Sequence, residues 1–424
     1  MNYKETLEYM FNKLPMFQRI GGAAYKADLG NTIRLCEILH HPEHRFPAVH
    51  IAGTNGKGST SHMLASVFQE AGFKTGLYTS PHYSDFRERI KIDGKMVPEQ
   101  FVVDFMERYN GRFEDIGLSF FEMTVGMAFS YFADGNVDIA VIETGMGGRL
   151  DSTNVIMPMI SVITNIGMDH MQFLGNSLAE IAAEKAGIIK PSVPVVIGET
   201  QESITHVFHD RAEQLSSPIT FADRYWKLEE SVQGSIRIFR EGKHFTDIDP
   251  FPLNGSFQRK NLVTVMETLY RLQEKLPEIN PRIISAGIAK TVLHTGLKGR
   301  WQILQTSPLV VCDSGHNPEG IAEVISNIHS TPHDKLHIVF GIVNDKDASA
   351  ILSMLPANAT YYFCKPDIPR GLEAEKLAAM AAPHGLKGSV YNHVKEALKA
   401  AIGNSEKNDL IFVGGSTFVV AGVV

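Results

Sequence analysis

The stretch PAVHIAGTNGKGSTSHMLASVFQEAG, residues 47–72, decides the fold. Its first part, residues 47–52, is an apolar run that predicts a buried strand. From Ser59 to Ala71 apolar residues recur at helical spacing on one face, and Gly72 is typical of the residue that follows a helix. A strand, a glycine-rich turn and an amphipathic helix in this order form the arrangement in which backbone N–H groups and a helix N-terminus bind phosphate.

The turn between the strand and the helix carries the residues suited to phosphate. Its glycines let the backbone approach an anion, Lys57 can neutralise phosphate charge, and Ser59 or Thr60 can add a hydroxyl contact. The strict pattern G-x-x-x-x-G-K-[ST] is not met, because Ile51 replaces the first glycine and Gly58 follows the lysine. A turn without a ligand is the alternative, but the flanking strand and helix favour a nucleotide site. The predicted ATP-binding residues of this turn are Gly53, Thr54, Asn55, Gly56, Lys57, Gly58 and Ser59.

Outward from this stretch, short apolar runs alternate with helical segments in two series. Continuous apolar strands separated by helices indicate mostly parallel sheets with both faces covered. Between the series, residues 215–255 alternate polar and apolar residues and predict a small antiparallel excursion, followed by a helix near 258–275. The predicted strands are 75–80, 137–143, 159–165 and 193–198 in the first series, and 308–313, 335–341, 359–364 and 409–415 in the second, where 373–382 and 394–402 are helical.

The two series predict two domains that meet at the turn-rich segment 294–300. The predicted fold class is α/β. Residues 1–296 form an N-terminal P-loop-type domain with a mostly parallel sheet, which includes the excursion. Residues 297–424 form a smaller, Rossmann-like C-terminal domain. No repeat or low-complexity tract interrupts this pattern.

Composition excludes several classes of protein. The 424 residues have 44% hydrophobic and 21% charged residues, as in globular domains, which excludes a disordered or fibrous chain. A net charge of −7 disfavours a nucleic-acid binder, and a mean hydropathy of −0.06 without an apolar run of about 18 residues predicts no membrane span. Three distant cysteines without a C-x-x-C spacing disfavour disulfides and thiolate zinc sites.

The N-terminal residues lack the continuous apolar segment of a signal peptide. Met10, Phe11, Leu14 and Phe17 lie at helical spacing, which predicts a helix packed on the domain. We therefore expect a reduced, cytoplasmic protein. HHPEH, residues 40–44, suggests a zinc site at first sight, but its spacing and its proline favour a plain loop.

Polar residues follow several of the predicted strands. Glu143 ends one strand, the position of a metal-holding acid in nucleotide hydrolases, although a solvated strand end is the alternative. Asp169 and His170 follow another strand and fall on the same rim of a parallel sheet, but lone histidines are usually structural. Ser80 can join a metal shell from a third strand end. Lys185 lies near a helix C-terminus, where a solvated lysine is the default.

Two further segments carry charged residues. TSPHYSDFRERI, residues 79–90, is either a polar surface segment or a source of arginines for anionic substrate groups. DSGHNPEG, residues 313–320, repeats the order strand, glycine, helix of the phosphate loop. An acid at its strand end, Asp313, can bind a ribose hydroxyl, and Arg300 can contact phosphate. This motif is weak when taken alone.

Together, these segments resemble the folylpolyglutamate synthase/dihydrofolate synthase family, a branch of the Mur ligase superfamily. The resemblance spans nearly the whole chain, and the motifs are specific as an ordered set rather than singly. Only 52 residues precede Gly53, which is short for the additional domain that the peptidoglycan ligases carry there, so we do not expect a ligase of that branch. The matching pieces are HIAGTNGKGST, YTSPH with FRERI, FFE, ETGMGGRLDSTN, TNIGMDH, EKAGIIKP, QRKN, GRW, DSGHNPEG and GGSTF.

The resemblance implies roles for matching positions. Asn261, Arg300 and Asp313 complete the ATP site, and Ser80, Glu143 and His170 are ligands of Mg²⁺, of which two ions are expected. Lys185 matches a lysine that is carboxylated to a carbamate, whose negative charge suits a metal site. Lys57, Glu143, His170, Lys185 and His316 are the expected catalytic residues. The expected pterin-side contacts are Ser119, Phe120, Phe121, Glu122, Leu150, Asp151 and Ser152.

The implied reaction is ATP-dependent amide formation, in which a carboxylate becomes an acyl phosphate and the amino group of L-glutamate displaces phosphate. The loop GGRLDSTN resembles that of bifunctional enzymes acting on dihydropteroate and on reduced folates. A monofunctional folylpolyglutamate synthase, a P-loop small-molecule phosphotransferase and a regulatory nucleotide-binding module are the alternatives. We expect a monomer that binds small molecules and neither nucleic acid nor membrane. The sequence leaves a monovalent-cation requirement open.

Overall fold

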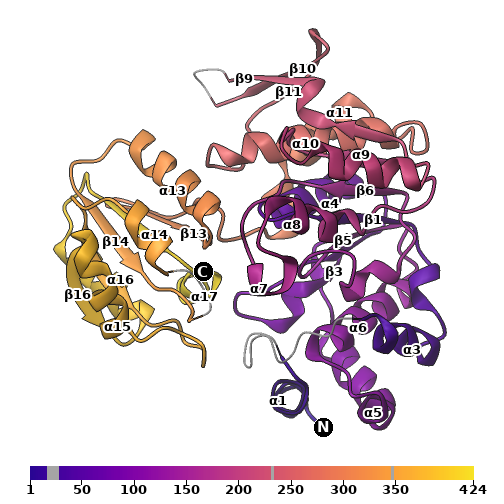
Figure 1. Ribbon diagram of the computed structural model, residues 1–424, viewed down its shortest axis with the longest axis horizontal. Helices are drawn as coiled ribbons and strands as arrows, with labels where there is room; N and C mark the ends of the chain where they lie inside the picture. Colours follow the sequence, from indigo (N-terminus) through magenta and orange to yellow (C-terminus); the bar gives the residue numbers. More distant parts are fainter. Residues whose placement is uncertain (17–27, 231–233, 345–347) are drawn as a thin grey trace. The chain divides into compact units, whose positions relative to one another are not determined.

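The computed structural model describes residues 1–16, 28–230, 234–344 and 348–424 (Figure 1). Phe17, the last position of the predicted N-terminal helix pattern, lies outside these ranges. The described chain divides into two compact units. The first comprises Met1–His82, Phe86–Pro252 and Gln258–Leu297, and the second comprises Tyr83–Asp85, Leu253–Phe257 and Lys298–Val424.

An eight-stranded sheet forms the centre of the first unit, in the order β4-β3-β2-β5-β1-β6-β7-β8. The six strands from β2 to β8 in this order are parallel, and β3 and β4 add an antiparallel edge. Every residue of β1, β2, β5 and β6 is buried, which explains why these strands are continuous apolar runs. The bounds are β1 (Ala48–Ala52), β2 (Thr75–Tyr78), β3 (Ile90–Ile92), β4 (Lys95–Met96), β5 (Ile139–Glu143), β6 (Ile160–Ile163), β7 (Val195–Ile197) and β8 (Ile219–Phe221).

Helices cover both faces of this sheet (Figure 1). α4, which follows the phosphate loop, packs on β1, β2 and β5 and on α11 and α12, so residues 59–68 are buried on all sides. The prediction of an amphipathic helix with one exposed face was therefore wrong for most of its length. The helices are α1 (Tyr3–Lys13), α3 (Gly30–Ile38), α4 (Lys57–Glu70), α5 (Glu99–Ile116), α6 (Phe120–Asp134), α7 (Met171–Leu174), α8 (Leu178–Ala186), α9 (Thr205–Gln214), α10 (Phe257–Leu272), α11 (Pro281–Ala289) and α12 (Thr291–Thr295).

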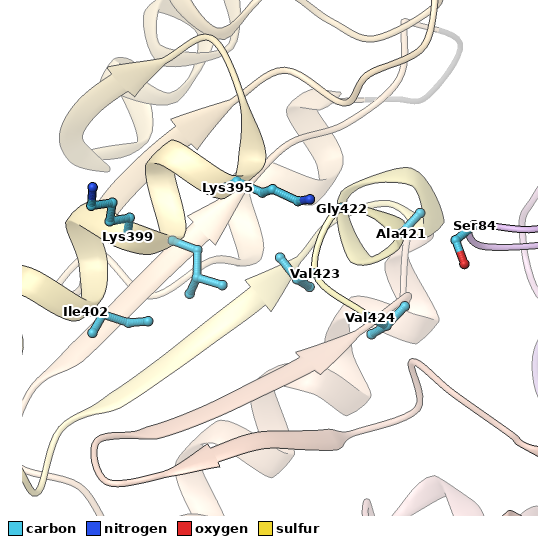
Figure 2. Close-up of a pocket in the computed structure, with 9 residues that line it drawn as sticks. Ser84, Lys395, Lys399, Ile402, Ala421, Gly422, Val423 and Val424 are labelled. Carbon is cyan, nitrogen blue, oxygen red and sulfur yellow. The ribbon is translucent and has the colours of Figure 1, made fainter.

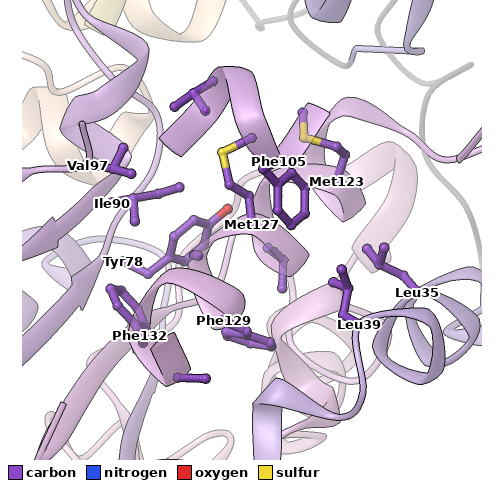
Figure 3. Packing of buried hydrophobic residues seen from close by; sticks show 14 of the residues in the cluster. Leu35, Leu39, Tyr78, Ile90, Val97, Phe105, Met123, Met127, Phe129 and Phe132 are labelled. Carbon is purple, nitrogen blue, oxygen red and sulfur yellow. The ribbon is translucent and has the colours of Figure 1, made fainter. Parts of the chain in front are cut away.

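An aromatic and methionine-rich core packs between α6 and the sheet (Figure 3). Tyr78, Phe129 and Phe132 are fully buried there, and burial of each such ring stabilises the fold by about 1.5–3 kcal/mol. α3 lies so close to α6 that a Cβ on Gly126 would stand 2.6 Å from Leu35 Cδ2. This packing fixes the helix that begins at the predicted substrate residues 119–122.

The antiparallel excursion is smaller than predicted. It is a three-stranded sheet, β11-β10-β9, formed by β9 (Trp226–Glu230), β10 (Ile236–Arg240) and β11 (Lys243–Ile248). Residues 219–221, placed in the excursion by the sequence, instead form β8 and pair in parallel with β7. The alternating pattern missed this because a three-residue edge strand is too short to show a period.

The second unit contains a six-stranded sheet, in the order β12-β13-β17-β14-β15-β16, with β12 antiparallel and the others parallel. One face packs on α13, α14 and α15, and the other on α16 and α17. The bounds are β12 (Gln302–Thr306), β13 (Leu309–Asp313), β14 (Leu336–Phe340), β15 (Thr360–Cys364), β16 (Lys387–Tyr391), β17 (Leu410–Gly414), α13 (Pro318–Ser330), α14 (Ala348–Met354), α15 (Ala374–Ala381), α16 (Val394–Asn404) and α17 (Thr417–Ala421). The predicted α/β fold class is confirmed. Across the described ranges, no helix combines the length and apolarity needed to cross a membrane.

Candidate active site

The carboxyl ends of β2, β5, β1 and β6 meet at one edge of the first sheet, because these neighbouring strands are parallel. Each strand end is followed by a segment that the sequence singled out: 79–90 after β2, 144–152 after β5, 53–59 after β1 and 164–170 after β6. Residues scattered over more than 100 positions are thus gathered at one edge, the usual location of ligand sites in open α/β sheets.

The phosphate loop requires glycine at two positions. Gly53 has φ +148°, and a Cβ there would stand 1.8 Å from Thr164 Oγ1. Gly56 has φ +83°, and a Cβ there would stand 2.1 Å from Asn261 Oδ1. Backbone conformation and space therefore both exclude a side chain at each position.

The loop is held from β6 by hydrogen bonds. The N–H of Thr54 donates to the Asn165 carbonyl oxygen, and the N–H of Asn55 donates to Asn165 Oδ1, each at 2.9 Å. Thr164 Oγ1 donates to the Asn55 carbonyl oxygen at 2.6 Å. Thr164 and Asn165 thus hold the loop in place, a role that was not predicted from the sequence although the motif TNIGMDH that contains them was recognised.

The beginning of α4 suits an anion. Gly56 is its N-cap residue, and no described side chain caps the helix. The hydroxyl oxygens of Ser59 and Thr60 are buried and have no hydrogen-bond partner within the described part of the chain. Because an uncapped helix start presents N–H groups and partial positive charge, and buried hydroxyls need partners, these features fit phosphate and its metal ion.

Two lysines converge on one carbonyl group of this loop. Lys57 Nζ donates to the carbonyl oxygens of Gly53 at 2.9 Å and Thr54 at 3.2 Å. Lys185 Nζ donates to the same Gly53 oxygen at 2.9 Å from a position 132 residues away. Lys185 is only 4% exposed, so the default of a solvated lysine was wrong. Burial first, and then the charge of Lys57, lower the pKa of Lys185 to about 7, against the opposing charges of Asp169 and Asp151.

A neutral lysine amine is the form that reacts with carbon dioxide to give a carbamate. With its pKa near 7, Lys185 is substantially neutral at physiological pH, whereas an ordinary lysine is almost wholly protonated. Burial thus favours the neutral amine, the form that the carboxylation implied by the family resemblance would require.

The acidic strand end of β5 contacts the segment after β2. Glu143 is 4% exposed, and its Oε2 accepts a hydrogen bond of 3.2 Å from the N–H of Ser80. Glu143 is therefore not a solvated strand end. His170 begins α7 at the same edge with φ +53°, and its Nε2 lies 3.9 Å from Asp169 Oδ2. Hydroxyl, carboxylate and imidazole groups at one sheet edge form a donor set that can hold Mg²⁺ together with phosphate oxygens.

Asp151 organises the glycine-rich segment after β5. Its Oδ2 accepts from the N–H groups of Gly145 at 2.8 Å and Met146 at 2.9 Å, and its Oδ1 accepts from Thr153 N at 3.0 Å and Oγ1 at 2.6 Å. The ring of His50, in β1, lies 2.8 Å from Thr153 Oγ1. Asp151 is thus a buried positioning residue. Burial raises the pKa of its carboxyl group, whereas the four hydrogen bonds lower it. Leu150 and Ser152 flank it.

The predicted substrate residues 119–122 begin α6. Ser119 and Glu122 form a capping box, in which each side chain accepts from the other's backbone N–H. Phe120 is buried in the aromatic core, whereas the ring of Phe121 covers Gly145, where a Cβ would stand 2.5 Å from it. Phe121 is the member of this group that the structure brings to the glycine-rich segment.

The second unit carries its own constellation at the end of β13. Asp313 is 4% exposed, and its carboxylate accepts from the N–H of Trp301 at 2.7 Å and of Gly315 at 2.8 Å. Burial raises the pKa of Asp313, while Arg300 and these hydrogen bonds lower it. Arg300 Nη1 donates to Tyr83 Oη at 3.1 Å, and His316 Nδ1 lies 2.9 Å from the Ser314 carbonyl oxygen.

Tyr83 is a second contact that the sequence reasoning missed. The segment 79–90 was singled out for its arginines, but Tyr83 belongs to the second unit and lies beside Arg300. Arg89, by contrast, is 3% exposed and donates from Nε to His82 Nδ1 at 2.7 Å, so the reading of 79–90 as a polar surface segment was wrong there.

An open pocket of about 550 Å³ lies elsewhere on the second unit (Figure 2). It is lined by Ser84 and by residues of α16 and the last four positions, including Lys395 and Lys399, all of them outside the predicted set. The candidate site is therefore defined by polar contacts and loop geometry rather than by this pocket.

Comparison with known proteins identifies the class. Residues 51–269 match the Mur ligase middle domain, and residues 299–417 match the Mur ligase glutamate ligase domain. A folylpolyglutamate synthase of Lacticaseibacillus casei is 32% identical, with 100% of this chain and 98% of the relative covered. The chain spans only 50% of a probable bifunctional folylpolyglutamate synthase/dihydropteroate synthase of Haloferax volcanii, at 31% identity over 99% of its own length.

Solved structures agree with this class. Escherichia coli FolC in complex with DHPP and ADP superposes with a TM-score of 0.86 at 27% identity, covering 99% of this chain and 96% of that one. A bifunctional folylpolyglutamate synthase/dihydrofolate synthase with Mn, AMPPNP and L-glutamate bound gives 0.84 at 26% identity, covering 99% and 97%. The fold is thus that of a Mur-type ligase. Within that class, the chain belongs to the folylpolyglutamate synthase/dihydrofolate synthase family.

Proposed function

We propose that this protein ligates L-glutamate, at the expense of ATP, to 7,8-dihydropteroate and to the glutamyl tail of reduced folates. It is an ATP- and Mg²⁺-dependent ligase that forms a C–N bond. We further propose that it acts as a monomer in the cytoplasm and binds small molecules only. The single observation that carries the activity is the gathering of phosphate loop, Glu143 and Lys185 at one sheet edge of a chain of this family.

The residues of the first unit bind either the phosphates of ATP or Mg²⁺. The uncapped start of α4 and Lys57 bind and neutralise the phosphates of ATP, with Asn261 packed against the loop at Gly56. Ser80, Glu143 and His170 would hold Mg²⁺, which supplies charge neutralisation when bound. A carboxylate of the pteroate or folate attacks the γ-phosphorus, ADP leaves, and an acyl phosphate forms.

The other predicted residues of the first unit orient the pterin side of the folate substrate. Asp151 fixes the turn at Gly145, and Phe121 covers it, so these two residues shape the pterin side. Lys185 as a carbamate would add an anionic group at the phosphate loop and offset the charge of Lys57. The remaining pterin-side residues, Ser119, Phe120, Glu122, Leu150 and Ser152, are proposed as its neighbours by resemblance.

We assign residues 1–296 as the ATPase and folate domain and residues 297–424 as the glutamate ligase domain. In the second domain, Arg300 and Asp313 are proposed for the nucleotide, and His316 for the reacting groups. The amino group of L-glutamate attacks the acyl carbonyl carbon, the C–N bond forms, and phosphate leaves. Because every reactant is anionic, local positive features rather than the net charge of −7 must bind them.

The test is an assay matrix read by mass. The full chain is given ATP, Mg²⁺ and L-glutamate with either dihydropteroate or a reduced folate, and each product is weighed. We expect ADP and a product longer by one glutamyl residue with both acids. Product from one acid only refutes bifunctionality, and a stable phosphorylated end product or sustained turnover of ATP without glutamate refutes the ligase.

A variant pair ties the activity to the phosphate loop. Lys57→Met removes the positive charge at the phosphates and should lower kcat at least about 10²-fold. Lys190→Met, a lysine that donates instead to the Asn154 carbonyl oxygen, is the control and should retain activity. Equal rates for Lys57→Met and wild type refute the assigned site.

A further inference from the structure

The segment HHPEH, residues 40–44, was predicted from the sequence to be a plain loop, but in the structure it brings three possible ligand atoms together. Pro42 occupies the first position of a single 3-10 turn, Pro42–His44, that follows α3. His41 Nδ1 lies 2.9 Å and His44 Nε2 lies 3.4 Å from Glu43 Oε1, and the three atoms lie within 4.8 Å of one another. In residues 1–16, 28–230, 234–344 and 348–424, this is the one such group of three.

The carboxylate of this group is buried, whereas its imidazoles face solvent. The side chain of Glu43 is 5% exposed, against 52% for His41 and 64% for His44. Its second oxygen, Oε2, is buried, and the carboxylate also accepts a hydrogen bond from the buried Cys36 thiol. The carboxylate is therefore held in place from inside the fold, and its Oε1 faces the two exposed imidazoles.

The distances fit a tetrahedral transition-metal ion. Zinc binds imidazole nitrogen and carboxylate oxygen at about 2.0–2.2 Å, which places neighbouring ligand atoms about 3.3–3.5 Å apart. The separations from Glu43 Oε1, 2.9 and 3.4 Å, require little movement to reach that geometry. Imidazole selects zinc-like ions over Mg²⁺, which prefers oxygen ligands.

We propose that His41, Glu43 and His44 form a binding site for Zn²⁺ or a similar divalent transition-metal ion, with solvent in the remaining position. One carboxylate and two neutral imidazoles leave a net charge of −1, which a divalent cation complements. The Cys36 thiol nearby stays protonated, since burial and the charge of Glu43 raise its pKa.

This site is remote from the nucleotide chemistry. It precedes β1, whereas the phosphate loop follows β1, so the five residues of that strand separate them by about 17 Å. The ion would close the connection between α3 and β1, where the turn also packs on α6. Its role is therefore structural, and it does not contribute to the Mg²⁺ site at the opposite edge of the sheet.

Calorimetry on the full chain tests the site. The protein is prepared without a histidine tag, stripped of metal with a chelator and titrated with Zn²⁺ in the absence of nucleotide. His41→Asn removes one ligand at a residue with φ +53°, which asparagine tolerates, and Glu43→Gln removes the anionic ligand. We expect wild type to bind one more ion than either variant, or the variants to bind it at least about tenfold more weakly.

His40→Asn is the matched control, since His40 precedes the site, has φ +61° and is not a member of the group. It should bind Zn²⁺ as wild type does, and Zn²⁺ should raise the unfolding temperature of both but not of His41→Asn. If either variant fails to fold, His44→Asn replaces it. Equal titrations for all variants, or no zinc-edge anomalous peak at this turn in a soaked crystal, overturn the proposal.

Discussion

The two strand–turn–helix segments, residues 51–60 and 311–320, share one order of elements but differ in how the helix begins. In the first, α4 starts at Gly56, and no described side chain caps it. In the second, the side chain of Asn317 accepts a hydrogen bond of 2.8 Å from the N–H of Gly320, and Pro318 follows it. The second helix therefore satisfies part of its own N-terminus, which the first leaves to a ligand.

The charged groups of the two segments also differ, since the first carries positive charge and the second negative charge. The first gathers two lysines on the Gly53 carbonyl oxygen. The second ends its strand in the buried carboxylate of Asp313, which accepts from two backbone N–H groups. A similar sequence pattern thus produces an uncapped helix start beside two lysines in one segment and an acidic, internally bonded turn in the other. The presence of a cap, rather than the pattern, separates them.

Alanine at Gly56 should break the first segment most severely. The added Cβ meets Asn261 Oδ1 at 2.1 Å, and φ +83° disfavours alanine, so the loop must move by about 1 Å or more. Such a displacement costs about 10²-fold in kcat/KM for ATP, measured by steady-state kinetics.

Two glycines serve as controls for this loss. Gly72→Ala has a similar φ of +90° but nothing within 4 Å of its Cβ, so it carries only the conformational cost, about 1–2 kcal/mol of stability. Gly315→Ala, in the second segment, brings its Cβ to 3.0 Å from the Gly320 carbonyl oxygen and should lower kcat/KM much less. Equal losses at Gly56 and Gly72 would contradict the importance of close packing in the phosphate loop.

Lys185 should give the first segment a pH-dependent stability. The unfolded chain keeps this proton up to its ordinary pKa near 10.5, whereas the folded chain releases it near 7. Between these values the unfolded state binds more protons, so the free energy of unfolding rises with pH by up to about 1.4 kcal/mol per unit. Denaturant unfolding in carbonate-free buffer at pH 7 and 9 measures this rise.

Lys185→Met should remove this rise. Burial also lowers the pKa of Lys190, to about 8, so the difference between wild type and the variant separates the contribution of Lys185 from that of Lys190. An unchanged pH dependence in the variant would show that the amine is not buried as described. With ¹³C-bicarbonate added, wild type should gain a carbamate resonance in NMR that the variant lacks.

Asp313→Asn probes the second segment. An amide offers one acceptor oxygen, so either the N–H of Trp301 or that of Gly315 loses its partner, and a buried unsatisfied group costs about 1–3 kcal/mol. Thermal unfolding should report this loss, and KM for ATP should rise. Asp334→Asn, an exposed aspartate of the same unit, should change neither, and equal effects of the two variants would remove Asp313 from the nucleotide site.

The sequence allowed the buried framework to be predicted, because a strand covered on both faces must be continuously apolar. β1, β5, β14 and β17 are of this kind. β16 was missed because its residues are largely exposed and polar, so it contributes no apolar run. Local composition thus reveals the centre of each sheet and not its edges.

The candidate site was predictable where its chemistry is local. The glycines and lysine of the phosphate loop lie within one motif. The contact of Lys185 with Gly53 joins positions 132 residues apart, and that of Asn55 with Asn165 joins positions 110 apart. Such pairs, and the burial that lowers the pKa of Lys185, follow from tertiary packing that no local pattern encodes.

The smallest expected effect tests the cap that distinguishes the two segments. Asn317→Ala removes the side chain that accepts from Gly320 N, and Asn280→Ala removes the cap of α11, which accepts from Arg282 N and Ile283 N. Each should cost about 1 kcal/mol of stability. If α13 has no anion at its beginning, KM for ATP stays unchanged in both variants. A rise in KM for Asn317→Ala alone would mean that the capped helix also serves a ligand, and capping would then no longer explain why the two segments differ.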